Sequence, residues 1–126
     1  MDKGTAFFNG QWVAPSELAL RVDDLGVLMG AAVVERLRTF RGEPFRLDEH
    51  LARMERSLSI AGFDAIPLAQ ELAKMIAECA RRNYAQIHPD DDLALIAFVT
   101  PGPPGAESPT VCVHALPLSF SAWAEQ

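Results

Sequence analysis

His50 and Arg53 stand three residues apart in a segment, residues 45–57, whose pattern is typical of an amphipathic helix. At this spacing both side chains project from nearly the same side of a helix. One interpretation of Arg53 is a clamp for a phosphate or carboxylate, because a guanidinium fork matches the oxygens of those groups. The other is an ion pair with Glu49, four residues earlier on the same helix. Spacing alone favours the ion pair.

Three charged residues, Glu35, Arg36 and Arg38, interrupt an otherwise apolar segment over residues 31–40. This segment is typical of a strand, in which alternate side chains share a face. Arg36 and Arg38 then lie on one face, and Glu35 lies on the other. Either the arginine face is solvated, or it lines a pocket in which arginine receives a carboxylate. Strand periodicity leaves both interpretations open.

The other reactive side chains form no recognisable constellation. The histidines have no second ligand at metal spacing, so the sequence predicts no metal site. Ser57 and Ser59 have no histidine-acid pair arranged around them, and neither Lys3 nor Lys74 is an obvious buried amine. Cys79 and Cys112 lie outside any CxxC motif, and we expect two reduced, buried thiols in a cytoplasmic protein.

The composition is that of one globular domain. The chain has 126 residues, of which 49% are hydrophobic and 22% charged. Its net charge is 11 − 17 = −6, which argues against general nucleic-acid binding because phosphate contacts need a basic surface. We see no signal peptide and no apolar run of transmembrane length, so we expect no membrane association.

Periodicity and turn residues predict the elements that position these side chains. Asn9-Gly10 predicts a tight hairpin over residues 6–13. The remaining expected elements are a strand over 31–40, a return arm from 43, helices over 47–61 and 67–82, and strands over 93–100 and 110–116. Helices grouped between strands predict an α+β fold: a two-layer, mainly antiparallel sheet with two helices on one face.

Several blocks of the chain occur together in a recognisable order. They are Phe8-Asn9-Gly10, Val22-Asp23-Asp24-Leu25-Gly26, Gly30 with Val33-Val34-Glu35, Leu37-Arg38-Thr39-Phe40 with Gly42, the run from Phe45 to Leu51 with Arg53 and Ser57, and Val99-Thr100-Pro101-Gly102. Together they resemble the N-terminal domain of the fold-type IV pyridoxal-phosphate enzymes. These class IV aminotransferases include branched-chain aminotransferases, D-amino-acid aminotransferases and aminodeoxychorismate lyases.

The resemblance implies roles for individual residues. Arg53 would bind the phosphate of pyridoxal phosphate, which reverses the preference drawn from spacing. Met29, Val34, Arg36 and Arg38 would line the substrate pocket. The full-length enzyme would be a homo-oligomer, expected as a homodimer, acting on amino acids and 2-oxo acids with a branched-chain-like preference. Met29 and Val34 replace aromatic residues of the family and Arg36 a small one, which predicts an altered pocket.

The family's lysine that forms a Schiff base with the cofactor belongs to a C-terminal domain. We therefore expect residues 1–117 to be an N-terminal domain and residues 118–126 to begin an interdomain linker. The chain alone would contain no catalytic residue, would be inactive, and would not retain the cofactor. The alternatives are a non-catalytic binding or regulatory module with the same fold, and a small interaction domain with no cofactor history.

Overall fold

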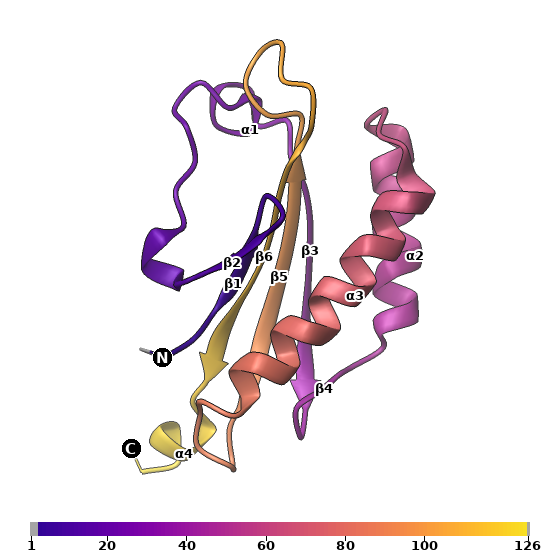
Figure 1. Cartoon of the computed structure of the whole chain (residues 1–126). Helices are drawn as coiled ribbons and strands as arrows, with labels where there is room; N and C mark the ends of the chain where they lie inside the picture. Colours follow the sequence, from indigo (N-terminus) through magenta and orange to yellow (C-terminus); the bar gives the residue numbers. More distant parts are fainter. Residues whose placement is uncertain (1–2, 126) are drawn as a thin grey trace.

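The structure, a computed structural model, describes residues 3–125 and contains a six-stranded antiparallel sheet in the order β2-β1-β6-β5-β3-β4 (Figure 1). The strands are β1 Ala6–Phe8, β2 Gln11–Val13, β3 Val33–Phe40, β4 Glu43–Pro44, β5 Asp92–Thr100 and β6 Thr110–Leu118. The long helices α2, Leu47–Ile60, and α3, Ala65–Tyr84, cover one side of the sheet (Figure 1). Short turns complete the chain: η1 Pro15–Glu17, α1 Leu25–Leu28 and α4 Phe120–Trp123. The predicted α+β fold is confirmed.

The predicted elements are present, with shifted ends. The hairpin turns at Asn9 and Gly10, whose φ angles of 48° and 88° suit a type I′ turn. Helix α3 begins two residues before Pro67, which is tolerated in a first turn because its missing N–H would have no partner there. Strand β6 continues to Leu118, the residue at which we expected a linker to begin. The domain boundary itself stays a prediction.

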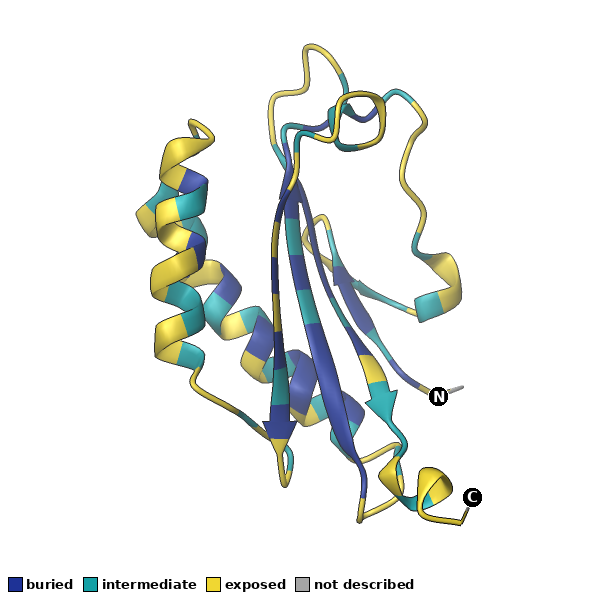
Figure 2. Ribbon diagram, turned by 180° about the vertical axis from the view of Figure 1, so that it is seen from behind, coloured by how far each residue is buried: buried dark blue, intermediate teal, exposed yellow. Residues whose placement is uncertain are grey.

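Burial differs between the strands of the sheet. Strand β3 alternates between buried and exposed or half-buried positions, whereas β5 is buried along most of its length (Figure 2). The buried side carries the core, in which the apolar stripes of α2 and α3 pack on the central strands. Its largest fully buried apolar side chains are Met54, Leu58, Leu72, Ile76, Leu93, Leu95, Val99 and Val113.

The opposite side, here called the open face, carries the alternate residues of the same strands. Residues 18–20 lie beside its β6 half, where Phe98 and His114 line a shared hollow with them. Outside that hollow, Val34 of β3 and Leu116 of β6 are 58% and 47% exposed on the same face. Exposed apolar side chains therefore stand on the open face at both β3 and β6. Within residues 3–125 no helix is both long and apolar enough to cross a bilayer.

A buried carboxylate ties the N-terminal segment to the far end of the sheet. Asp24 accepts hydrogen bonds from the hydroxyls of Thr100 at 2.6 Å and Thr110 at 2.7 Å, and from the Gly26 N–H at 2.8 Å. Burial opposes its charged form, but these hydrogen bonds outweigh burial, so the pKa of Asp24 lies below its ordinary value. At the other end, Asp92 similarly accepts from Thr39.

We predict that Asp24→Asn lowers the free energy of unfolding near neutral pH by about 2 kcal/mol, the scale of hydrogen bonds to a charged group. A depressed folded pKa stabilises the protein above the ordinary aspartate value of 3.8, and this contribution is lost as pH falls through the folded pKa. The variant should therefore lose less stability between about pH 7 and about pH 3 in urea unfolding. Asp23→Asn, at the exposed neighbour, is the control, and an equal effect of both variants would contradict the assignment.

Candidate functional site

A buried carboxylate lies at the edge of β3, the strand whose outer side is paired by β4 only at Thr39 and Phe40. Glu35 is 5% exposed and faces α2. Its oxygens accept hydrogen bonds from Arg53, whose Nε lies 3.2 Å from both and whose Nη2 also contacts Oε1. The Nδ1 of His50 lies 2.5 Å from Oε1. An ionised carboxylate only accepts, so Nδ1 is the nitrogen that donates.

This arrangement fixes the charges of the Glu35 group. Burial opposes ionisation of Glu35, but the hydrogen bonds and charges of Arg53 and His50 outweigh it, so the pKa of Glu35 lies below its ordinary value. The hydrogen bond and charge of Glu35 in turn raise the pKa of Arg53. Near neutral pH the carboxylate is ionised, and the guanidinium is held in one orientation.

The prediction from spacing that Arg53 pairs with Glu49 is wrong. Glu49 instead lies 3.6 Å from Arg46, the residue before α2 begins. Arg53 sits at the border of the buried stripe of α2 and reaches across to β3 rather than along its own helix. A buried carboxylate is a stronger partner than a solvated one, because it has no water to replace the arginine.

Arg53 and His50 line a small polar hollow, here called the anion hollow, of about 260 Å³ with Glu49 and Arg56. The side chain of Arg53 is 59% exposed, although its guanidinium is anchored by Glu35. Within residues 3–125 its Nη1 makes no hydrogen bond and remains available as a donor. The carboxylate of Glu49 is paired with Arg46, so the two guanidinium groups and the imidazole leave the hollow suited to a phosphate-sized anion. These residues fit the phosphate of pyridoxal phosphate.

A second hollow, here called the β3 hollow, lies beside the first and shares His50 with it. It has a volume of about 490 Å³. The lining residues are Arg36, Leu37, Arg38, Phe45, His50, Ala94, Leu118 and Phe120. An anion-binding region and a half-apolar hollow therefore meet at one imidazole on the edge of β3.

The structure brings together two of the four predicted pocket residues. Arg36 and Arg38 line the β3 hollow. Val34 lies next to Arg36 on the same face but is not among the lining residues. Met29 is 76% exposed in the turn after α1 and lines neither hollow.

Arg38 is held by its neighbours. Its Nε donates to the carbonyl of Thr39 at 2.9 Å, and its Nη2 lies 3.7 Å from Asp92. Its guanidinium also stacks over Phe40, 3.7 Å from the ring centroid, and lies 5.1 Å from that of Phe120. Arg38 is therefore a fixed wall of the hollow.

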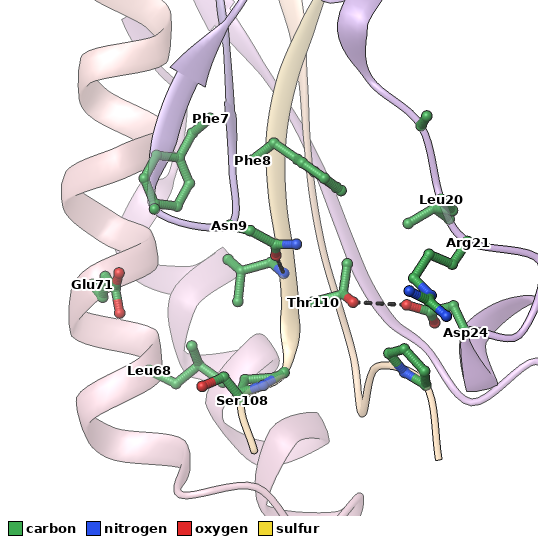
Figure 3. Close-up of a pocket in the computed structure, with 15 residues that line it drawn as sticks. Phe7, Phe8, Asn9, Leu20, Arg21, Asp24, Leu68, Glu71, Ser108 and Thr110 are labelled. Carbon is green, nitrogen blue, oxygen red and sulfur yellow. Dashed lines mark hydrogen bonds between the residues drawn. The ribbon is translucent and has the colours of Figure 1, made fainter. Parts of the chain in front are cut away.

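A further hollow of about 640 Å³ lies elsewhere, around the beginning of β6 (Figure 3). Figure 3 shows Glu71 on one side of the strand and Arg21 and Asp24 on the other. Asp24 is satisfied by its hydroxyl partners, and Arg21 pairs with Asp23 at 2.8 Å. The polar groups do not converge, so we do not assign chemistry to this hollow.

Neither lysine contributes to the anion hollow or the β3 hollow. Lys74 is exposed on α3, and Lys3 is exposed near the N-terminus. Among residues 3–125 there is no group of three or more His, Cys, Asp and Glu side chains that could hold a metal ion. Cys79 and Cys112 are buried free thiols, as expected.

We predict that Arg53 couples energetically to Glu35 and not to Glu49. Double-mutant cycles would combine Arg53→Gln with Glu35→Gln and, as the matched control, with Glu49→Gln, using urea unfolding. The coupling free energy should be clearly larger for Glu35, because that carboxylate is buried and bound by the guanidinium, whereas exposed i,i+4 pairs contribute little. A larger coupling to Glu49 would contradict the observed geometry.

Comparisons with known proteins agree with this architecture. The family model for amino-transferase class IV matches residues 32–126. A D-alanine aminotransferase of Staphylococcus aureus is 33% identical over 80 residues, covering 64% of this chain and 28% of that protein. An aminodeoxychorismate lyase of Bacillus subtilis is 30% identical over 77 residues, covering 61% of this chain and 26% of that protein.

Similarity in three dimensions extends over more of the chain. A hypothetical aminotransferase from Mycobacterium tuberculosis, in a pyridoxal-phosphate-bound form, superposes with a TM-score of 0.78 at 22% identity. The match covers 96% of this chain and 42% of that protein. The chain thus spans under half of the length of these relatives. The extent of the family match, with the fold that accompanies it, shows that the chain belongs to the class IV aminotransferase family.

Proposed function

We propose that this chain is the N-terminal domain, residues 1–117, of a pyridoxal-phosphate-dependent amino-acid aminotransferase or lyase. In this proposal Arg53 binds the cofactor phosphate in the anion hollow, and Met29, Val34, Arg36 and Arg38 belong to one wall of the substrate pocket. The observation that carries the proposal is the meeting of the two hollows at His50, next to an arginine fixed by buried Glu35. Amino acids and 2-oxo acids are the proposed substrates.

Each residue has a defined task in this proposal. When bound, pyridoxal phosphate supplies an electron sink for the bond broken at the α-carbon of the substrate. Arg53 holds the phosphate with the donors that Glu35 leaves available, and Glu35 keeps the guanidinium from swinging into solvent. His50 donates to Glu35 and stands between the anion hollow and the β3 hollow.

The open face supplies the wall on which a substrate side chain packs. Val34 and Phe98 are register partners on neighbouring strands, and Ile96 lies opposite Arg36 in the next outward-facing row. This apolar surface would exclude water from the reacting groups and receive an aliphatic side chain, which supports the branched-chain-like preference.

We further propose that the chain alone is inactive and retains the cofactor poorly, because both lysines lie away from the anion hollow and the β3 hollow. The same observation favours the second candidate, a binding or regulatory module that keeps the fold without catalysis. The buried free thiols Cys79 and Cys112 support a cytoplasmic location, where cysteines stay reduced.

We predict that Arg53→Ala, in the longer protein read from the gene, raises the Kd for pyridoxal phosphate about tenfold or more, the scale of losing a hydrogen bond between charged groups. Absorbance titration of the apoprotein measures the change, with Arg81→Ala on the far surface of α3 as the control. In the 126-residue chain, inorganic phosphate should shift the Arg53 Nε–H resonance in NMR spectra. An unchanged titration in both experiments removes Arg53 from the site.

The exposed apolar side chains of the open face, Val34 and Leu116 among them, predict self-association of the 126-residue chain, because exposed apolar surface favours contact between copies. Sedimentation velocity should show concentration-dependent association that Val34→Lys weakens. Ile60→Lys is the control, since Ile60 is 88% exposed at the end of α2, away from this face. A strict monomer at high concentration would count against a homo-oligomer built through this surface.

A further inference from the structure

Arg36 differs from the other arginines near the two hollows. Arg53 is bound to Glu35, Arg46 to Glu49, and Arg38 to Asp92 and two aromatic rings. Within residues 3–125, Arg36 makes neither a hydrogen bond nor an ion pair, and its side chain is exposed on the open face. A guanidinium without a partner leaves its fork of donors available to an anion.

The surroundings of Arg36 favour such an anion. Among residues 3–125, those that line the β3 hollow include two arginines and a histidine but no aspartate or glutamate. The chain as a whole carries a net charge of −6, so this hollow is locally basic on an acidic protein. Directly across the sheet from Arg36 lie Ile96 on β5 and then His114 on β6. Apolar neighbours limit competition from water and strengthen a charged hydrogen bond.

We propose that Arg36 is a specificity-determining residue that binds the distal carboxylate of an acidic substrate, a dicarboxylic amino acid or 2-oxo acid. The inference rests on the proposed function, which packs the substrate side chain on the open face. An aliphatic side chain can pack there on Val34, Ile96 and Phe98. The carboxylate of an acidic side chain instead needs a cation to replace the water that hydrates it in solution. Arg36 supplies that cation within the same patch and allows one wall to receive both kinds of side chain.

The assignment to the distal carboxylate follows from the position of Arg36 on its strand. It lies on the face of β3 opposite Glu35 and the Arg53 contact, with the apolar patch on either side. A substrate with its α-carbon near the cofactor would extend its side chain, rather than its α-carboxylate, over that patch. Arg38 is already bound to Asp92 and stacked on two rings, so its donors are less available to a substrate carboxylate.

The first test uses the 126-residue chain and does not depend on catalysis. Burial lowers the pKa of His114, and the charge of Arg36 lowers it further, which makes the imidazole a reporter of that charge. Glutarate should shift the Arg36 Nε–H resonance and raise the pKa of His114 in NMR titrations. Arg36→Gln should raise that pKa without ligand and abolish the response to glutarate. Arg81→Gln removes the same charge on the opposite side of the molecule and should respond as the unmodified chain does.

The second test uses the longer protein read from the gene, with the L and D forms of glutamate and leucine as donors. Arg36→Gln should lower kcat/KM for glutamate about tenfold or more relative to kcat/KM for leucine, as expected for one lost charged hydrogen bond. Equal losses for both donors would mean that Arg36 binds the common α-carboxylate, and would overturn the inference. Glutarate binding that persists in Arg36→Gln would also overturn it. If the unmodified protein converts neither donor while Arg36 binds glutarate, the proposed function fails and the carboxylate contact stands alone.

Discussion

The carboxylate of Glu35 lies on the helix side of β3, among the apolar residues that fill the core, and is bound by a guanidinium and an imidazole from α2. A carboxylate in that position is costly unless it is ionised with partners at hydrogen-bond distance. This requirement fixes where α2 can sit against the edge of β3. It also sets the orientation of Arg53 and His50, and with them the placement of both hollows.

Strand β3 connects the two hollows because successive residues along it face opposite sides. Glu35 points to the helices and anchors the anion hollow, while Arg36 stands on the open face beside the β3 hollow. Neighbouring residues on one strand cannot shift independently, so the distance between the two hollows is set by backbone geometry. Pairing with β5 over residues 33–38 keeps that backbone rigid. A short strand edge thus supplies a fixed separation between an anion-binding group and a side-chain-binding surface.

The sequence was sufficient for most of the fold because its patterns are local. Asn9-Gly10 determines a hairpin, and the stripe through Met54 and Leu58 determines the buried side of α2. The sequence was insufficient to identify the partner of Arg53, because the pattern of a helix shows only which residues are neighbours on that same helix. Glu35 was nevertheless a signal, since it shares the inward face of β3 with Val33 and Leu37, and a carboxylate at an inward position requires a partner.

Other features of the site depend on contacts between distant segments and carry no local pattern. Phe120 and Arg38 are far apart in sequence, yet the ring lies 5.1 Å from the guanidinium. Whether Arg36 and Arg38 were solvated or part of a pocket could not be decided by alternation, because both cases give the same spacing. The difference between a bound Arg38 and an unpartnered Arg36 arises only when β5 brings Asp92 close to one of them.

The hydrogen bonds of Asp24 also impose an order on folding. Its partners Thr100 and Thr110 are 76 and 86 residues away, and β1 pairs with β6 from the other end of the chain. Contacts of such long sequence separation form slowly, because a large loop must close before they contribute. During synthesis β1 and Asp24 therefore cannot form these contacts until β6 has left the ribosome. Until then, the edges of β1 and β5 that β6 will join stay open to other chains, which makes the interval before β6 emerges a period of risk of misassembly.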